Sequence, residues 1–287
     1  MQLNGPPPAL DRTLLRELFR FNARLGLYRF LKGMDYVRCI EFPTFAATLL
    51  QRRTESLAYL DVGSGDSVLP TFIATHSDYR VSTIDKFEWV QAQARYLRKL
   101  GKGEWLANGR FTVRQEDFVT ATSLAAGTFD LITALSVVEH MDGDGDSQAV
   151  RKIFRLLKPG GRFLMSSPYN EQRAQDFFVP HAVYGAAPDA RGAFFQRHYS
   201  AETLRQRIID AAPFEVERIF YAGHYDRVNF FKRFWLVPAW LKPLKILYNW
   251  AAPFYAPHFL QLSATPPADA QPQMVTADTA FLFLRKP

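Results

Sequence analysis

The chain has 287 residues, 48% of them hydrophobic and 22% charged, which fits one globular α/β domain with additions or two small domains. Lysine and arginine outnumber aspartate and glutamate by 35 to 28, and the resulting net charge of +7 suits anionic partners such as phospholipid or nucleic acid, although many soluble enzymes carry such a charge. The single cysteine, Cys39, excludes an internal disulfide and a cysteine-based metal cluster.

The N-terminal residues MQLNGPPPALDRT lack the basic start, apolar run and small-residue cleavage site of a secretory signal. No uninterrupted apolar run reaches the roughly 20 residues that a membrane span needs. We therefore expect a cytoplasmic protein.

Residues 1–54 are predicted to form a helical extension. Apolar residues recur at three- and four-residue spacing over residues 9–32, with Asp11 near the start and Lys32-Gly33 at the end, which predicts one amphipathic helix with a basic polar side. A second helix is predicted from Pro43 to about residue 52.

From residue 55 to residue 223, apolar β-like runs alternate with helical stretches, beginning with the strand LAYLDVG. This alternation predicts a parallel sheet flanked by helices, with a ligand site at the carboxyl ends of the strands. A substrate loop is expected over residues 168–198, then a helix at 200–209 and a strand at 214–222. An aromatic and basic insert with a linker (224–278) precedes a final strand within residues 279–287.

The stretch YLDVGSGDS ends a predicted strand with Asp61 and continues into Gly63, Ser64 and Gly65. Glycines let the backbone pass close to a ligand, and the amides at the start of the next helix can meet an anionic group. By itself this pattern also describes an ordinary tight turn.

Two acidic residues follow later strands of the predicted sheet. Asp85, next to Lys86, ends the run VSTID, where a carboxylate can accept both hydroxyls of a ribose; capping the helix that begins near Phe87 is the alternative. Asp117, beside Phe118, follows a third strand, where a carboxylate can accept a hydrogen bond from an adenine amino group.

The run FDLITALSVVEH predicts a fourth strand that brings Ser136, Glu139 and His140 to the same edge. LLKPGGRF then reads as a helix end that turns directly into a fifth strand.

In their order and spacing these motifs resemble the class I S-adenosylmethionine-dependent methyltransferases, over about residues 55–221 and the last strand. The resemblance implies a Rossmann-like, seven-stranded, mostly parallel sheet and S-adenosylmethionine as the cofactor. It further implies contacts with the methionine part, the ribose and the adenine of that cofactor. The residues so assigned are Asp61, Gly63, Gly65 and Ser136 for methionine, Asp85 for ribose, and Asp117 with Phe118 for adenine. Ser64 and Lys86 are also expected to bind the cofactor. Ser67 departs from the family pattern, where many members have glycine.

Methyl transfer from a sulfonium relies mainly on positioning and desolvation, and a hydroxyl acceptor would also need a base. His140 is the first candidate for that base, with packing or turn capping as the alternative. Substrate contacts are expected from residues in segments that can fold over the site; these residues can equally anchor a loop. They are Glu139, Arg197, His198, Tyr199 and His224.

The segment DGDGDS, residues 142–147, imitates the start of a calcium loop but has Ser147 where glycine is needed and Ile153 where glutamate is needed. We expect no metal site, and Asp146 or Ser147 is predicted to cap the next helix.

Residues 227–260 combine three tryptophans with five lysines or arginines and no acidic residue. Such a stretch suits a membrane interface, while a substrate lid, an oligomer interface and nucleic-acid binding are alternatives. The expected function is methyl transfer to a small or lipid-associated acceptor, such as a lipid, a quinone-like compound or a lipid-linked glycan, at the cytoplasmic membrane face. A non-catalytic scaffold of the same fold ranks second, and a nucleic-acid methyltransferase ranks third.

Overall fold

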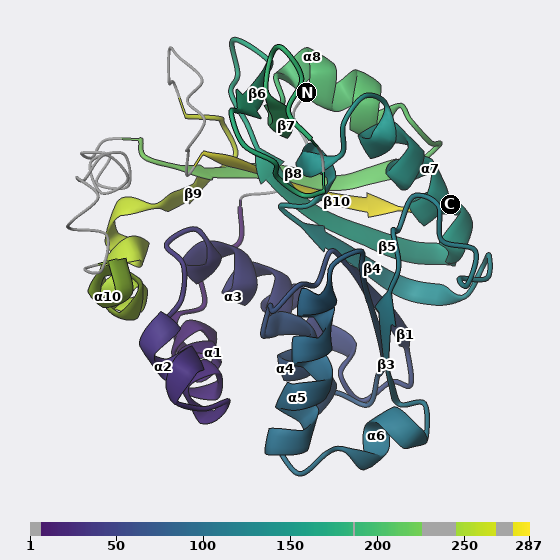
Figure 1. Cartoon of the computed structure of the whole chain (residues 1–287), viewed down its shortest axis with the longest axis vertical. Helices are drawn as coiled ribbons and strands as arrows, with labels where there is room; N and C mark the ends of the chain where they lie inside the picture. The colour runs from purple at the N-terminus through teal and green to yellow at the C-terminus, as the bar shows by residue number, and fades with distance from the viewer. Residues whose placement is uncertain (1–6, 186, 226–244, 268–277) are drawn as a thin grey trace.

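The computed structural model describes residues 7–185, 187–225, 245–267 and 278–287 (Figure 1). A mostly parallel sheet in the order β3-β2-β1-β4-β5-β10-β8-β9 runs through the molecule, with helices on both faces. One apolar core lies between the sheet and the helices on the side of α1, α3, α4 and α5, and a second lies on the side of α7 and α8. The division of the chain at residues 54, 223 and 278 stays a prediction.

Five parallel strands begin the sheet, as the alternating pattern predicted; they are β1 (Ala58–Val62), β2 (Arg80–Asp85), β3 (Phe111–Gln115), β4 (Phe129–Leu135) and β5 (Leu157–Pro168). The last strand, β10 (Thr279–Arg285), inserts antiparallel between β5 and β8 (Glu215–Gly223). An eighth strand, β9 (Gln261–Ser263), extends the expected seven by pairing with β8. Its three residues are too few to show a strand pattern in the sequence.

The helices between these strands follow the predicted alternation. They are α4 (Leu69–His76), η2 (Glu88–Gln91) with α5 (Ala92–Lys99), α6 (Glu104–Ala107), η3 (Val138–His140), α7 (Gly145–Leu156), and α8 (Ala201–Leu204), which continues as the π-helical η4 (Arg205–Ile209). Ser200 caps α8 by accepting a hydrogen bond from the Thr203 amide.

The predicted helix over residues 9–32 is two helices, α1 (Arg12–Arg24) and α2 (Leu27–Lys32). Gly26 separates them with a φ of 115°, a conformation that other residues rarely adopt. The Asn22 side chain holds the break by donating to the Arg29 and Gly33 carbonyls, at 2.8 and 3.0 Å. The single-helix prediction was wrong because the apolar spacing continues across this turn.

The helix predicted to begin at Pro43 begins five residues earlier, as α3 (Arg38–Leu49), followed by η1 (Leu50–Arg52). Proline lacks a backbone donor and is best tolerated in the first turn of a helix, which is why the start was predicted at Pro43; in α3 it lies inside the helix instead. The early start places Arg38 and Glu41 one turn apart, and their side chains form an ion pair.

The expected loop over residues 168–198 contains a hairpin, β6 (Gln175–Val179) and β7 (Ala193–His198). It is anchored through Asp146, which lies fully buried in the first turn of α7. Asp146 accepts hydrogen bonds from Arg197 and from the Tyr199 hydroxyl, both at 2.8 Å, and pairs with Arg207. The N-cap position of α7 is Asp144, so the prediction that Asp146 or Ser147 caps the helix was wrong. Asp146 lies inside the first turn, where its Oδ1 also accepts from the Ser147 amide at 2.7 Å.

The helix α10 (Lys245–Phe259) lies against α2. The Met34 amide donates to the Asn249 carbonyl at 3.1 Å, and a Cβ at Gly33 would come within 2.5 Å of the Asn249 backbone. Residues 226–244, which include the first 18 residues of the aromatic and basic stretch at 227–260, lie outside the described residues. No helix in the described ranges is long and apolar enough to cross a bilayer.

Candidate functional site

The glycine turn follows β1 and bends sharply at two left-handed residues. Gly63 and Gly65 have φ values of 68° and 46°. A Cβ at Gly63 would lie 2.4 Å from the Val137 methyl groups, so the turn passes too close to the end of β4 for any side chain. The buried Ser64 hydroxyl donates to the Asp61 carbonyl at 2.9 Å and fixes the turn from within.

The Asp61 carboxylate is hydrogen-bonded to side chains on β1 and β4. Its Oδ1 accepts from the Tyr59 hydroxyl at 3.2 Å and from the Thr133 hydroxyl on β4. Burial raises the pKa of Asp61 to about 6, even though these hydroxyls favour the ionised form. Asp61 thus locks β1 to β4, and its role toward a cofactor stays a prediction.

Asp85 joins the end of β2 to the glycine turn. Its Oδ2 accepts from the Gly65 amide at 3.0 Å and its Oδ1 from the Phe87 amide at 2.9 Å. A carboxylate has about four lone-pair positions, so two of them remain for further donors such as a pair of hydroxyls. Burial raises the pKa of Asp85 above its usual range.

The other residues predicted to bind the adenosine part make contacts of their own near this edge of the sheet. The Lys86 ammonium lies 5.1 Å from the centre of the Phe87 ring. Asp117 is exposed and accepts from the Val119 amide at 2.9 Å, while the Phe118 ring is buried in the core. Their contacts with a cofactor stay predictions.

Ser136 follows β4 with a positive φ of 50°, an uncommon conformation for a residue with a side chain. Its hydroxyl donates to Glu41 Oε1 at 2.9 Å, and Arg38 Nη1 lies 3.4 Å from the Leu135 carbonyl. Arg38 and Glu41 therefore belong to the site. The sequence analysis missed them because it placed the start of α3 at Pro43.

Glu139 is the most unusual group at this edge. Its side chain is 1% exposed, and neither carboxyl oxygen has a hydrogen-bond partner among the described residues. Burial raises the pKa of Glu139 to about 8, and the nearby Glu41 carboxylate adds to the rise. A buried, unpartnered carboxyl group is costly, which is typical of a group kept for a ligand or a reaction.

His140 stands beside it with one ring nitrogen fixed. Nδ1 lies 2.6 Å from the Phe195 carbonyl, which can only accept, so Nδ1 carries the proton and Nε2 keeps its lone pair. Nε2 is 4.0 Å from Glu139 Oε1, and the His140 side chain is 21% exposed. Burial lowers the pKa of His140 to about 4, so the ring is neutral at pH 7.

An aromatic cluster covers these groups, and the sequence analysis missed its central member, Tyr184. Its ring centre lies 4.7 Å from that of His140, 5.9 Å from that of Phe195 and 6.0 Å from that of Phe87. Burial raises the pKa of Tyr184, and the nearby Glu139 and Asp85 carboxylates act in the same direction. Tyr184 therefore packs on His140 and Phe87 at this edge of the sheet, although no motif in its loop marked it.

The remaining predicted substrate residues are held by other contacts. Arg197 and Tyr199 bind Asp146, and Arg197 also binds Asp176. The His198 ring nitrogen Nε2 lies 2.7 Å from the Gln196 amide nitrogen, and His224 Nε2 lies 2.9 Å from the Tyr36 hydroxyl. Direct contact of these residues with a substrate stays a prediction.

Comparison with known proteins agrees with this arrangement. Residues 60–165, which contain the glycine turn, Asp85, Asp117 and the Glu139–His140 pair, match the family model described as a methyltransferase domain. Residues 60–165 thus belong to a methyltransferase domain. The match supports S-adenosylmethionine as its cofactor and an enzymatic role.

Curated relatives share this domain at moderate identity. A ubiquinone biosynthesis O-methyltransferase of Pseudomonas paraeruginosa is 31% identical over 125 residues, which are 44% of this chain and 50% of the relative. A protein of the same name from Pseudomonas aeruginosa is 30% identical over the same length. The chain thus spans about half the length of the curated relatives it matches.

Solved structures share the fold along nearly the whole chain. The [4+2]-cyclase SpnF has a TM-score of 0.53 at 17% identity and covers 99% of both chains. The 1,6-didemethyltoxoflavin-N1-methyltransferase of Burkholderia thailandensis has a TM-score of 0.52 at 14% identity, covering 99% of this chain and 93% of that one. At these identities the likeness establishes the Rossmann-like fold of the methyltransferase domain, and it does not assign a reaction.

Proposed function

We propose that this protein binds S-adenosylmethionine and transfers its methyl group to a small acceptor. The observation that carries the proposal is the Asp85 carboxylate, fixed by the Gly65 and Phe87 amides with two lone-pair positions left for the ribose hydroxyls. When bound, the cofactor supplies a methyl group already activated by its sulfonium. The glycine turn, Ser136 and Asp117 would line its other parts.

The protein's own contribution is positioning and the exclusion of water. Tyr184 and its aromatic neighbours cover the edge where Asp85 and Glu139 lie. A covered, low-dielectric site strengthens the remaining polar contacts and holds an acceptor in one orientation.

For a hydroxyl acceptor, the Glu139–His140 pair is the proposed proton acceptor. His140 is the more exposed member and offers the Nε2 lone pair, and Glu139 Oε1 lies 4.0 Å from the same nitrogen. The Phe195 carbonyl orients the ring through Nδ1, and an ionised Glu139 would stabilise the protonated imidazole through its charge.

The proposed acceptor is apolar or lipid-associated, for example a lipid, a quinone-like compound or a lipid-linked glycan at the cytoplasmic face of a membrane. Two observations support this class. The curated relatives are named for ubiquinone biosynthesis. In addition, α2 and α10 expose several large apolar side chains, namely Leu27, Leu31, Leu247, Trp250 and Phe254.

Replacing Asp85 with alanine is expected to weaken binding of S-adenosylhomocysteine by about 10- to 100-fold, because hydrogen bonds to a charged group are lost and the Gly65 amide is released. Isothermal titration calorimetry measures the change. Asp78→Ala is the matched control, since Asp78 is exposed just before the opposite end of β2, and it should stay within about twofold of the parent. Equal affinities of the parent and the Asp85 variant would remove the ribose assignment.

The acceptor class is tested by transferring a radiolabelled methyl group from S-adenosylmethionine into a whole-cell extract, followed by chloroform/methanol partition. Label in the organic phase is the expected result. Label confined to the aqueous phase would contradict the lipid-associated acceptor, and cofactor binding without any label would favour a non-methylating role for the fold.

A further inference from the structure

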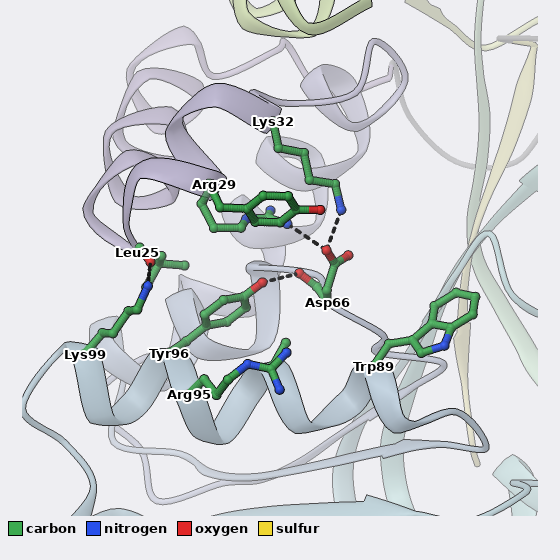
Figure 2. A pocket seen from close by; sticks show the side chains of 10 residues that line it. Leu25, Arg29, Lys32, Asp66, Trp89, Arg95, Tyr96 and Lys99 are labelled. Carbon is green, nitrogen blue, oxygen red and sulfur yellow. Dashed lines mark hydrogen bonds and ion pairs between the residues drawn. The ribbon is translucent and has the colours of Figure 1, made fainter. Parts of the chain in front are cut away.

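A cavity of about 420 Å³ lies between the N-terminal helices and α5, with the turn around Asp66 between them (Figure 2). The α2 side contributes Arg29 and Lys32, and the α5 side contributes Arg95 and Lys99. Asp66 is the one acidic residue in the lining. Positive charge is therefore in excess, and this excess favours an anionic occupant.

The cationic side chains on the two sides of the cavity differ in their ion-pair and hydrogen-bond partners. Arg29 and Lys32 both pair with Asp66, which is shared between them. The Lys99 ammonium, which has three N–H donors, donates one hydrogen bond to the Leu25 carbonyl at 2.7 Å. Arg95 is exposed and has no hydrogen-bond or ion-pair partner in the ranges the structure describes. The donors still available thus lie mainly on α5, across the cavity from the Asp66 pair.

Arg29 gives the cavity a fixed cationic wall. Its side chain is 9% exposed, its Nε donates to Asn22 at 2.8 Å, and its Nη1 donates to Asp66 at 3.0 Å. Because a guanidinium has five N–H groups, donors remain after these two bonds. A nearly buried arginine held in one orientation is suited to a planar or tetrahedral oxyanion.

Aromatic side chains line the same cavity. Trp89 is 52% exposed and Tyr28 is 69% exposed, so both offer apolar surface to water in the absence of a ligand. The exposed Leu27 and Leu31 lie on α2, the helix that also carries Tyr28. The occupant should accordingly combine an anionic group with an apolar body.

We propose that this cavity is a binding site for a phosphate ester, with the phosphate between Arg95, Lys99 and Arg29 and the apolar part against Trp89 and Tyr28. Nothing in the proposed methyl transfer requires it. The phosphate can come from a lipid headgroup or from a soluble phosphorylated molecule, since both present the same oxyanion.

The cavity is also connected to the glycine turn. The Tyr96 hydroxyl donates to the Asp66 carbonyl at 3.0 Å, and the Gln93 side chain donates to the Ser67 carbonyl at 2.6 Å (Figure 2 shows the first bond). An occupant that draws Lys32 or Arg29 away from Asp66 acts on the same turn that Asp85 holds from the other side.

The test measures binding alone, using glycerol 3-phosphate by calorimetry and phosphatidylcholine vesicles, with and without phosphatidylglycerol, by co-sedimentation. Arg95→Glu should weaken the binding of whichever probe the parent protein binds by about tenfold or more, because it reverses a charge facing the phosphate. Arg98→Glu is the matched control: it makes the same charge change on the same helix, but Arg98 does not line the cavity. The control should stay within about twofold.

Each arm identifies a source or overturns the proposal. Binding of glycerol 3-phosphate that only Arg95→Glu weakens would support a soluble phosphate ester. Binding restricted to vesicles with phosphatidylglycerol, and weakened only by Arg95→Glu, would support a lipid headgroup. No binding of either probe, or equal losses in the two variants, would overturn the proposal, and equal melting temperatures of the variants would show that folding is not the cause.

Discussion

Alanine in place of His140 is expected to lower kcat by about 10²- to 10⁴-fold with a hydroxyl acceptor, the range found for removal of a general base. The Phe195 carbonyl fixes the proton on Nδ1, so Nε2 is the nitrogen able to take a proton from an acceptor. Alanine removes that lone pair and leaves the glycine turn untouched. Steady-state kinetics measure kcat, and calorimetry with S-adenosylhomocysteine should show affinity within about twofold of the parent.

Glu139→Gln tests the role of Glu139 apart from that of His140, because glutamine keeps the shape of the side chain and cannot ionise. The parent's kcat/KM should rise with pH up to about 8 as Glu139 ionises, whereas the variant's profile should be flat over that range. A kcat of His140→Ala equal to that of the parent would exclude His140 as the general base. It would favour an acceptor that is already nucleophilic.

The same carboxyl group links stability to pH. Between its ordinary pKa of 4.5 and its folded pKa of about 8, Glu139 binds a proton in the folded state and not in the unfolded state. The free energy of unfolding of the parent should therefore fall as pH rises through this window. In Glu139→Gln this part of the decline should be absent. The melting temperature of the variant minus that of the parent should therefore increase between pH 5 and pH 8.

Asp146→Ala is expected to lower the free energy of unfolding by about 3–5 kcal/mol, the usual cost of removing one partner of a buried ion pair. The carboxylate is fully buried and satisfies Arg197, Tyr199 and Arg207 together. Without it, the Arg197 side chain, 9% exposed, keeps the more exposed Asp176 as its ion-pair partner and a 3.4 Å contact with the Gly143 carbonyl. Equilibrium unfolding in urea measures the loss.

Asp144→Ala is the matched control for that experiment. Asp144 immediately precedes α7 and pairs with Arg151 at 2.6 Å, but both side chains are about half exposed. An exposed pair contributes little, so the change should stay below about 1 kcal/mol. Equal losses in the two variants would mean that Asp146 is not the anchor of the hairpin.

The sheet could be predicted from the sequence because each of its parallel strands is marked by a local apolar run. Apolar runs end in acidic or polar residues at regular intervals, and this order places Asp85 and Glu139 at one edge without knowledge of any long-range contact. The family resemblance then supplied the cofactor. The observed sheet and the domain match confirm the fold and the family.

The parts that the sequence did not reveal depend on contacts between distant segments. Arg38 reaches the end of β4, some 97 positions away, and no local pattern marks such a partner. Tyr184 lies in a loop whose place is fixed by the hairpin and by Asp146. Similarly, the break at Gly26 leaves the apolar spacing intact and shows only in the backbone.

The central position of β10 has a consequence for how the chain is made. Residues 279–285 pair with β5 on one side and β8 on the other. On the ribosome, the five parallel strands and β8 emerge before the strand that joins them, so both facing edges stay unpaired until synthesis has passed residue 285. A nascent chain that stalls before residue 278 would present two open strand edges to chaperones or to other chains.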